Sequence, residues 1–268
     1  MQANNRKEAL LVTSFGTTRE EARQRSITAV ETALAEAFPA FALRIAHTSH
    51  YMVKHSETQD AEATPYIADA LTLLAEEGFE KVVIQPLHLI AGHEYEKILK
   101  AMQVSASRFK HLAVGKPLMA RGEDYLRLAK ALLPVYQELT EDEALLLMGH
   151  GSTHASDMAY THLQKTFHEL GMRNAIVGTV SGEVSLEGAI LCLERLKLRK
   201  VMLMPLMLVA GEHAFQDMAG EDPRSWKSIL HSLNYKVRVK MVGLGELEAV
   251  QAIYIDHVKE ALEGLNYA

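Results

Sequence analysis

Short apolar runs alternate with longer amphipathic segments along the whole chain. The runs have the length of buried strands, and the segments between them have the length and periodicity of helices. Strands that are apolar throughout are typical of parallel sheets with crossover helices, so the pattern predicts an α/β fold. The predicted strands are Ala9–Phe15, Ala42–Thr48, Lys81–Leu87, Ala144–Met148, Ala175–Val180, Val201–Leu208 and Lys236–Val242. The predicted helices lie near Arg19–Phe38, Glu62–Glu77, Glu94–Ser107, Tyr125–Glu138, Asp157–Leu170, Leu186–Leu196, Ala214–Leu233 and Glu246–Leu265.

The two halves of the chain carry similar motifs in the same order. Leu10–Thr18 is similar to Leu145–Thr153, and Val83–Gly92 is similar to Met202–Gly211, with Pro-Leu-x-Leu-x-Ala-Gly in both. Two α/β halves share some patterning by coincidence, but a shared motif of this length favours duplication of one unit.

Duplication predicts two similar lobes, each a parallel sheet flanked by helices, with a cleft between them. We expect the first lobe to cover residues 1–138 and the second, which carries the metal site, to cover residues 139–268. Ligands of open parallel sheets bind outside the carboxyl ends of the strands. The residues that directly follow each predicted strand are therefore the candidate site residues.

Imidazole and carboxylate groups follow the predicted strands of the second lobe. His150 lies between Gly149 and Gly151, His213 follows another strand, and Glu183 follows a third. Because parallel strands end at one edge, we expect His150 and His213 to face each other, with Glu183 completing a metal-binding set. Each residue also has a plainer interpretation. His150 would then be a loop histidine, His213 a surface residue at the start of a helix, and Glu183 an acid favoured by a helix dipole.

Three further residues at strand ends are predicted to contact the substrate. They are Phe15 and His88 in the first lobe and Ser181 in the second. Asp217, one turn after His213, could orient the imidazole of His213. His154 is interpreted as structural or as a residue that supports a metal ligand, because the glycine turn before it argues against a regular helical pair with His150.

The composition narrows the chemistry of such a site. The chain has 268 residues, 13 histidines and one cysteine, Cys192, so it can form neither an intrachain disulfide nor a thiolate zinc site. Imidazole and carboxylate ligands suit cobalt, nickel, iron or zinc. Cys192 lies in an apolar predicted helix and is expected in the core.

The net charge of −6 argues against a nucleic-acid partner and requires a local pocket for any acidic substrate.

Several function classes lack their usual motifs. Gly-x-x-x-x-Gly-Lys-Ser/Thr, Gly-x-Gly-x-x-Gly and Gly-x-Ser-x-Gly do not occur, so no nucleotide, hydride transfer or serine nucleophile is expected. No apolar stretch approaches the length of a membrane span, and Ala9–Val12 is too short for a signal-peptide core. We expect a cytoplasmic protein with no membrane partner. The sequence leaves open whether it forms a homo-oligomer.

Motifs spread over almost the whole chain resemble the anaerobic cobalt chelatases, class II tetrapyrrole chelatases that act on sirohydrochlorin or its factor II form without ATP. The motifs are Leu10–Thr17, Gln85–His88, Gly92–Ile98, Met148–His154, Val177–Gly182 and Leu203–Asp222. The resemblance implies a bilobal chelatase of cobalamin biosynthesis, with the metal and the macrocycle in the cleft between the lobes.

The resemblance also implies roles for individual residues. The two histidines of the family fall on His150 and His213, which would hold the metal and accept pyrrole protons. The family's glutamate, in Thr-Val-Glu-Gly, falls on Ser181, and Glu183 is the nearby carboxylate that could replace it. His93 stands where related chains often have an acid.

Two functions of different classes follow from these observations. The first is ATP-independent insertion of a divalent metal into sirohydrochlorin, with cobalt as the expected metal and iron or nickel as alternatives. The second is a tetrapyrrole- or metal-binding protein of the same fold without turnover, which Ser181 favours. A periplasmic-type binding protein is a third interpretation, and it requires a leader that the sequence does not show.

Overall fold

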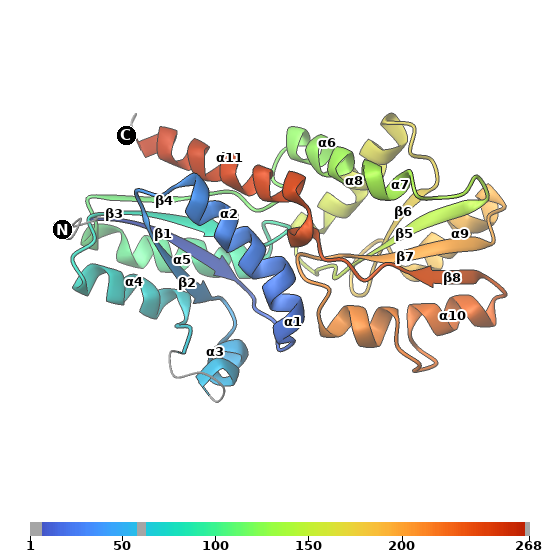
Figure 1. The fold of residues 1–268 in the computed structure, drawn as a ribbon, viewed down its shortest axis with the longest axis horizontal. Helices are drawn as coiled ribbons and strands as arrows, with labels where there is room; N and C mark the ends of the chain where they lie inside the picture. The colour runs from blue at the N-terminus through green and yellow to red at the C-terminus, as the bar shows by residue number, and fades with distance from the viewer. Residues whose placement is uncertain (1–6, 58–62, 266–268) are drawn as a thin grey trace.

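The computed structural model describes residues 7–57 and 63–265, which form two parallel four-stranded sheets (Figure 1). The first sheet has the order β2-β1-β3-β4, from β1 (Glu8–Ser14), β2 (Ala42–His47), β3 (Lys81–Pro86) and β4 (His111–Val114). The second has the matching order β6-β5-β7-β8, from β5 (Glu143–Gly149), β6 (Ala175–Thr179), β7 (Lys200–Leu206) and β8 (Lys236–Val239). The prediction of an α/β fold with two similar lobes is confirmed.

Helices flank both sheets. They are α1 (Glu20–Arg23), α2 (Ala29–Ala37), α3 (His50–Glu57), α4 (Ile67–Glu76), α5 (His93–Ser105), α6 (Gly122–Ala131), α7 (Leu133–Tyr136), α8 (Met158–Glu169), α9 (Leu186–Leu196), α10 (Trp226–Ser232) and α11 (Glu248–Leu265). A π-helical turn, Gln24–Thr28, joins α1 to α2, and a second one covers Ala214–Met218. Within the described ranges, no helix is both long enough and apolar enough to cross a membrane.

Several features differ from the sequence-based expectation. Strand β4 was not predicted, because it has only four residues and lies exposed or half-buried at the sheet edge. Helix α3 was not predicted either, and its sequence is largely polar. The predicted helix Glu62–Glu77 begins at Ile67, and Glu62 itself lies outside the described residues. Cys192 is exposed on α9, which corrects its expected place in the core.

The predicted helix Ala214–Leu233 is wrong as a single element. After the π-helical turn the backbone of Gly220 closely approaches Gln216, where a Cβ atom would meet the Gln216 carbonyl oxygen at 2.4 Å. Pro223 then removes a backbone donor, and Ser225 caps the start of α10 by accepting a hydrogen bond from the Ser228 N–H. The chain therefore turns before α10 begins.

The carboxyl ends of the two sheets face each other. Residues that follow strands in one lobe contact residues that follow strands in the other: Arg19 lies 3.2 Å from Glu212, and His93 lies 3.4 Å from Thr153. In both sheets the first strand of the lobe, β1 or β5, lies beside the third, β3 or β7, so the strand order reverses there. Such switch points are where open α/β sheets bind ligands.

Helix α11 joins the two lobes. It follows the second sheet in sequence but packs on α2, α6, β3 and β4, and it lies along the first lobe (Figure 1). One apolar core contains Leu10 of β1, Leu147 of β5, Phe167 of α8 and Tyr254 of α11. The lobes therefore share a core. The division of the chain into lobes of residues 1–138 and 139–268 stays a prediction. Helix α11 falls within the second range, but it packs on the sheet of the first lobe.

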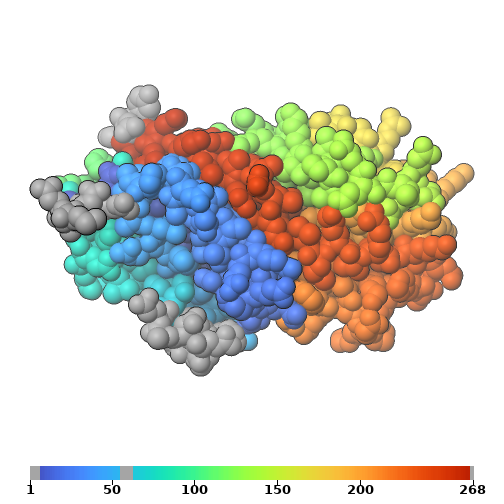
Figure 2. Space-filling model, viewed as in Figure 1, coloured from blue at the N-terminus to red at the C-terminus, as the bar shows by residue number. Residues whose placement is uncertain are grey.

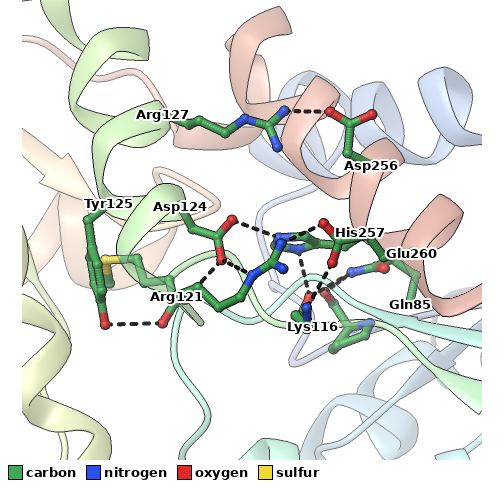
Figure 3. A network of polar contacts seen from close by, with 11 residues as sticks. Gln85, Lys116, Arg121, Asp124, Tyr125, Arg127, Asp256, His257 and Glu260 are labelled. Atoms are coloured by element: carbon green, nitrogen blue, oxygen red, sulfur yellow. Dashed lines mark hydrogen bonds and ion pairs between the residues drawn. The ribbon is translucent and has the colours of Figure 1, made fainter. Parts of the chain in front are cut away.

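A buried ion pair attaches α11 to α6 (Figure 3). The side chains of His257 and Asp124 are fully buried, and His257 Nε2–H donates to Asp124 Oδ1 at 3.1 Å. His257 Nδ1–H donates to the Lys116 carbonyl oxygen at 3.1 Å, so both ring nitrogens face acceptors. Glu260 of α11 adds ion pairs to Lys116 and Arg121.

The buried pair of Asp124 and His257 predicts how the free energy of unfolding depends on pH. Burial raises the pKa of Asp124, but the hydrogen bond and charge of His257 outweigh it and hold the pKa below the ordinary 3.8. A lowered carboxyl pKa stabilises the fold above the unfolded value, and the stabilisation is lost as the pH falls through the folded value. We expect Asp124→Asn to lower the free energy of unfolding at pH 7 by about 3 kcal/mol, because it removes one partner of a buried ion pair.

Urea unfolding at pH 7 and at pH 3 measures this effect, and the loss should be smaller at the lower pH. Asp256→Asn is the matched control, because Asp256 is a partly exposed carboxylate of α11 that pairs with Arg127 at 2.7 Å. Its loss should stay below about 1 kcal/mol. Equal losses from the two variants at pH 7 would contradict the buried ion pair.

Candidate active site

His150 and His213 meet at the switch point of the second sheet. His150 follows β5, and His213 directly precedes the π-helical turn after β7. Their ring centroids are 4.9 Å apart and the rings are nearly perpendicular, at 89°. Both side chains are exposed. The two imidazoles therefore face each other at the end of the sheet, as the common edge of parallel strands predicts.

One nitrogen of each ring donates a hydrogen bond to an oxygen atom. His213 Nδ1–H donates to Asp217 Oδ2 at 2.6 Å, and His150 Nδ1–H donates to the Gly151 carbonyl oxygen at 3.1 Å. Bonds of this kind set the tautomer and orient the ring of a metal-binding histidine. They leave Nε2 of both rings to bind a metal ion or accept a proton. Asp217 thus orients His213, as its spacing predicts.

The two glycines around His150 are required by packing. A Cβ atom on Gly149 would lie 2.5 Å from the ring of Tyr160. Gly151 has φ +79°, and a Cβ atom there would lie 2.6 Å from the backbone of Ser181. Tyr160 is buried, which raises its pKa to about 12, so it supports the loop as a neutral phenol. The glycines therefore fix the path of the chain that presents His150.

Asp157 ties the loop of His150 to the loop after β6. Its buried carboxylate accepts hydrogen bonds from the Ser152 N–H at 2.9 Å and the Glu183 N–H at 2.8 Å. Ser181 N–H donates to the His150 carbonyl oxygen at 3.0 Å. Ser181 and Glu183 therefore lie beside the histidine loop, and both side chains are exposed.

The structure does not assemble a third metal ligand beside the two histidines. Among residues 7–57 and 63–265, no three His, Cys, Asp or Glu side chains form a group that could hold a metal ion. Glu183 as the third ligand stays a prediction, as do substrate contacts at Phe15, His88 and Ser181.

The first lobe contributes an aromatic ring and a neutral imidazole at its own switch point. Phe15, directly after β1, is 50% exposed. His88, after β3, is largely buried, and this desolvation lowers its pKa to about 4. His88 Nε2 lies 3.2 Å from Thr48 Oγ1, while its Nδ1 has no hydrogen-bond partner among the described residues. His88 is therefore uncharged near neutral pH.

A second imidazole pair crosses between the lobes. His93, at the start of α5, has its ring centroid 5.1 Å from that of His154. His154 Nδ1 accepts a hydrogen bond from the Ser156 N–H, and its Nε2–H donates to Glu96 Oε1 at 3.3 Å. Both ring nitrogens of His154 are therefore engaged, and its structural or supporting role stays a prediction. His93 lies between Glu96 and Thr153, a contact that sequence analysis did not predict.

Comparison with known proteins identifies the family. The profile of the family "Cobalt chelatase (CbiK)" matches residues 8–263. The chain is 36% identical to the sirohydrochlorin cobaltochelatase of Salmonella typhimurium over 258 residues, which is 96% of this chain and 97% of that protein. It is 31% identical to the sirohydrochlorin cobaltochelatase CbiKC of Nitratidesulfovibrio vulgaris over 267 residues, 97% of this chain and 92% of that one. The chain belongs to the cobalt chelatase family.

Solved chelatase structures share the fold of this cobalt chelatase family member. SirB from Bacillus subtilis with Fe3+ superposes with a TM-score of 0.65 at 17% identity, over 96% of this chain and 97% of that one. CbiX, described as the terminal enzyme of siroheme biosynthesis in denitrifying bacteria, superposes with a TM-score of 0.55 at 16% identity, over 94% and 99%. At these identities the likeness concerns the bilobal architecture alone.

Three residues around the cobalt chelatase site were missed by sequence reasoning. Tyr160 is an apolar position in the pattern of α8, and Asp157 is a polar residue before that helix, so neither stands out. Arg19 lies before a helix in the other lobe, 193 residues from Glu212. No local signal marks such a contact, since it forms only when the lobes pack together.

Asp217 gives the first functional prediction for this site. Asp217→Asn keeps the shape but removes the charge that holds Nδ1–H of His213. We expect cobalt affinity and turnover to fall by about 10–100-fold, the usual effect of losing such an orienting partner. Cobalt binding measured by titration calorimetry and turnover measured with sirohydrochlorin test this. The control is Asp142→Asn, which removes an exposed carboxylate paired with Lys200 at 2.7 Å. If Asp217→Asn behaved like the control, Asp217 would have no orienting role.

Proposed function

We propose that this protein inserts cobalt(II) into sirohydrochlorin or its factor II form in the cytoplasm, without a nucleotide, as a step of cobalamin biosynthesis. The observation that carries the proposal is the perpendicular pair of His150 and His213 between the lobes, with Nε2 of each ring left available. The relatives named sirohydrochlorin cobaltochelatase support the substrate and the metal.

Metal insertion needs a proton acceptor and a weak metal site. Two pyrrole protons must leave the macrocycle, and the metal ion must lose water. An imidazole accepts a proton near neutral pH and also binds divalent metals. The carboxylate of Asp217 stabilises the imidazolium that forms when His213 takes a pyrrole proton. Two ligands leave open positions on the metal, so the ion passes to the macrocycle instead of being retained.

The first lobe provides the opposite wall of the site. Phe15 offers half-exposed aromatic surface against which a flat macrocycle stacks. His88 remains neutral near pH 7 and hydrogen-bonds to Thr48, so it adds no positive charge that would repel the metal. Ser181, on the second lobe, carries an exposed hydroxyl beside the His150 loop. We assign these three residues to substrate binding.

One observation favours a second candidate function, binding without turnover. Ser181 stands where the resemblance to the family places a glutamate. A protein that binds cobalt or tetrapyrrole and does not complete insertion would fit this departure.

Anaerobic visible spectroscopy decides between the two functions. Sirohydrochlorin is mixed with cobalt(II) and the protein, with no ATP present. We expect the spectrum of the metallated macrocycle to appear faster than in the absence of protein. A spectrum of bound, metal-free sirohydrochlorin that does not convert would instead support the binding protein.

His213 should carry the chemical step. We expect His213→Ala to lower kcat by about 10²–10⁴-fold, the usual contribution of a positioned acid–base group. The same anaerobic assay measures it. His168→Ala is the control, because His168 is an exposed histidine at the last turn of α8 that bonds to Gln164. Unchanged turnover in His213→Ala would remove this residue from the mechanism.

The third ligand can be tested by exchanging carboxylates. If Glu183 replaces the family's glutamate, Glu183→Gln should weaken cobalt binding by about tenfold or more, and Ser181→Glu should be neutral or improve it. Glu187→Gln, an exposed acid in the first turn of α9, is the control. If Glu183→Gln has no effect while Ser181→Glu strongly improves insertion, the protein works with two histidine ligands.

A further inference from the structure

Arg19 reaches from the first lobe to residues that flank His213. It occupies the N-cap position of α1, and its Nη1 lies 3.2 Å from Glu212 Oε2. Its guanidinium carbon lies 3.7 Å from the centroid of the Phe215 ring, a cation–π contact. Glu212 and Phe215 are the near neighbours of His213 in sequence. One cation of the first lobe is therefore held by residues that flank the candidate catalytic histidine in the sequence.

The contact borders a cavity of about 390 Å³ that both lobes line. Residues 18–22 and Arg25 line it from the first lobe, and Glu212 and Phe215 line it from the second. The space-filling view shows the first helices of the chain, in dark blue, directly against the orange surface of the second lobe (Figure 2). The cavity therefore lies at the junction where a ligand between the lobes would meet both of them.

The other charges of this cavity also have partners, and Arg25 reaches Glu246 of the second lobe at 3.8 Å. Glu20 contacts Gln24 at 2.9 Å and Arg23 at 3.8 Å, and Glu21 contacts Arg25 at 3.4 Å. Among the residues lining the cavity, Arg19 and Glu212 form the ion pair between the lobes.

This pair is not needed to hold the lobes together. Arg19 and Glu212 are 38% and 46% exposed, and exposed ion pairs contribute little to stability. Helix α11 and the shared core already join the lobes. A guanidinium that is stacked on an aromatic ring and half-exposed is well placed to bind a carboxylate through two parallel hydrogen bonds.

We propose that Arg19 is a specificity-determining residue that binds a peripheral carboxylate of the tetrapyrrole, and that Glu212 occupies this carboxylate position when no substrate is bound. The assignment rests on the proposed function, because sirohydrochlorin is a polycarboxylate. A protein with net charge −6 must attract such a substrate through local cations. Substrate binding exchanges one carboxylate for another on Arg19, so the guanidinium stays paired throughout.

Opposite effects of two substitutions test the exchange. Arg19→Gln removes the anchor, so the KM for sirohydrochlorin should rise about tenfold or more while kcat changes little. Glu212→Gln removes the competing carboxylate, so the KM should fall. Arg44→Gln is the matched control, because Arg44 has the same pairing far from the cleft: it contacts Glu77 at 3.3 Å and lies 5.4 Å from the Phe79 ring centroid. It should leave both constants unchanged.

If the ion pair of Arg19 and Glu212 only linked the lobes, the result would differ. Either substitution would break that link, so Arg19→Gln and Glu212→Gln would change the KM in the same direction. This outcome would overturn the proposal. An unchanged KM in Arg19→Gln would overturn it as well.

Equilibrium binding separates this proposal from the proposed function. The dissociation constant of metal-free sirohydrochlorin, followed by its absorbance, is measured for the wild type and for all three variants. If the wild type binds the macrocycle without inserting cobalt, the proposed function fails, but opposite shifts of the dissociation constant in Arg19→Gln and Glu212→Gln still support the anchor. Parallel or absent shifts overturn the anchor even where the wild type inserts cobalt.

Discussion

The packing of α11 on the first lobe is the constraint on which the site depends. The helix follows the second sheet in sequence, yet it buries its apolar face against β3 and β4 and its buried His257 against Asp124. The resulting core is continuous between the lobes. Two lobes that share a core cannot rotate freely, so the carboxyl ends of both sheets stay opposite each other. The histidines of one lobe therefore keep a fixed position relative to Phe15 and His88 of the other.

The two switch points have complementary chemistry. The second lobe presents two imidazoles, and Asp217 and the Gly151 carbonyl select the nitrogens that remain available. The first lobe presents an exposed ring and an imidazole that burial keeps uncharged. Both lobes have the same strand order, so equivalent strand ends meet across the interface. The residues at those ends differ, and under the proposed function one lobe handles the metal and the other holds the macrocycle.

Most of the fold could be predicted because its signals are local. Seven of the strands appear as apolar runs, and the glycines around His150 mark a sharp turn whose neighbours are Tyr160 and Ser181. The failures have local causes as well. Strand β4 is short and lies at an edge, so it has little apolar signal. The break before α10 depends on a close backbone approach at Gly220, and helical periodicity does not record such an approach.

By itself, the sequence determined the α/β class, the repeat of two lobes and the placing of His150 and His213 at strand ends. These features follow from hydrophobic periodicity and from the shared direction of parallel strands, which act over a few residues. Only the tertiary structure decided which nitrogen of each histidine is available, that Ser181 donates to the His150 backbone, and that Arg19 meets Glu212. The partners of the two histidines lie close to them in the chain or in a neighbouring loop of the same lobe, and the local backbone path and side-chain rotamers decide those bonds. Arg19 and Glu212 are 193 residues apart and meet because the lobes pack together, so no periodic pattern in the sequence records their contact.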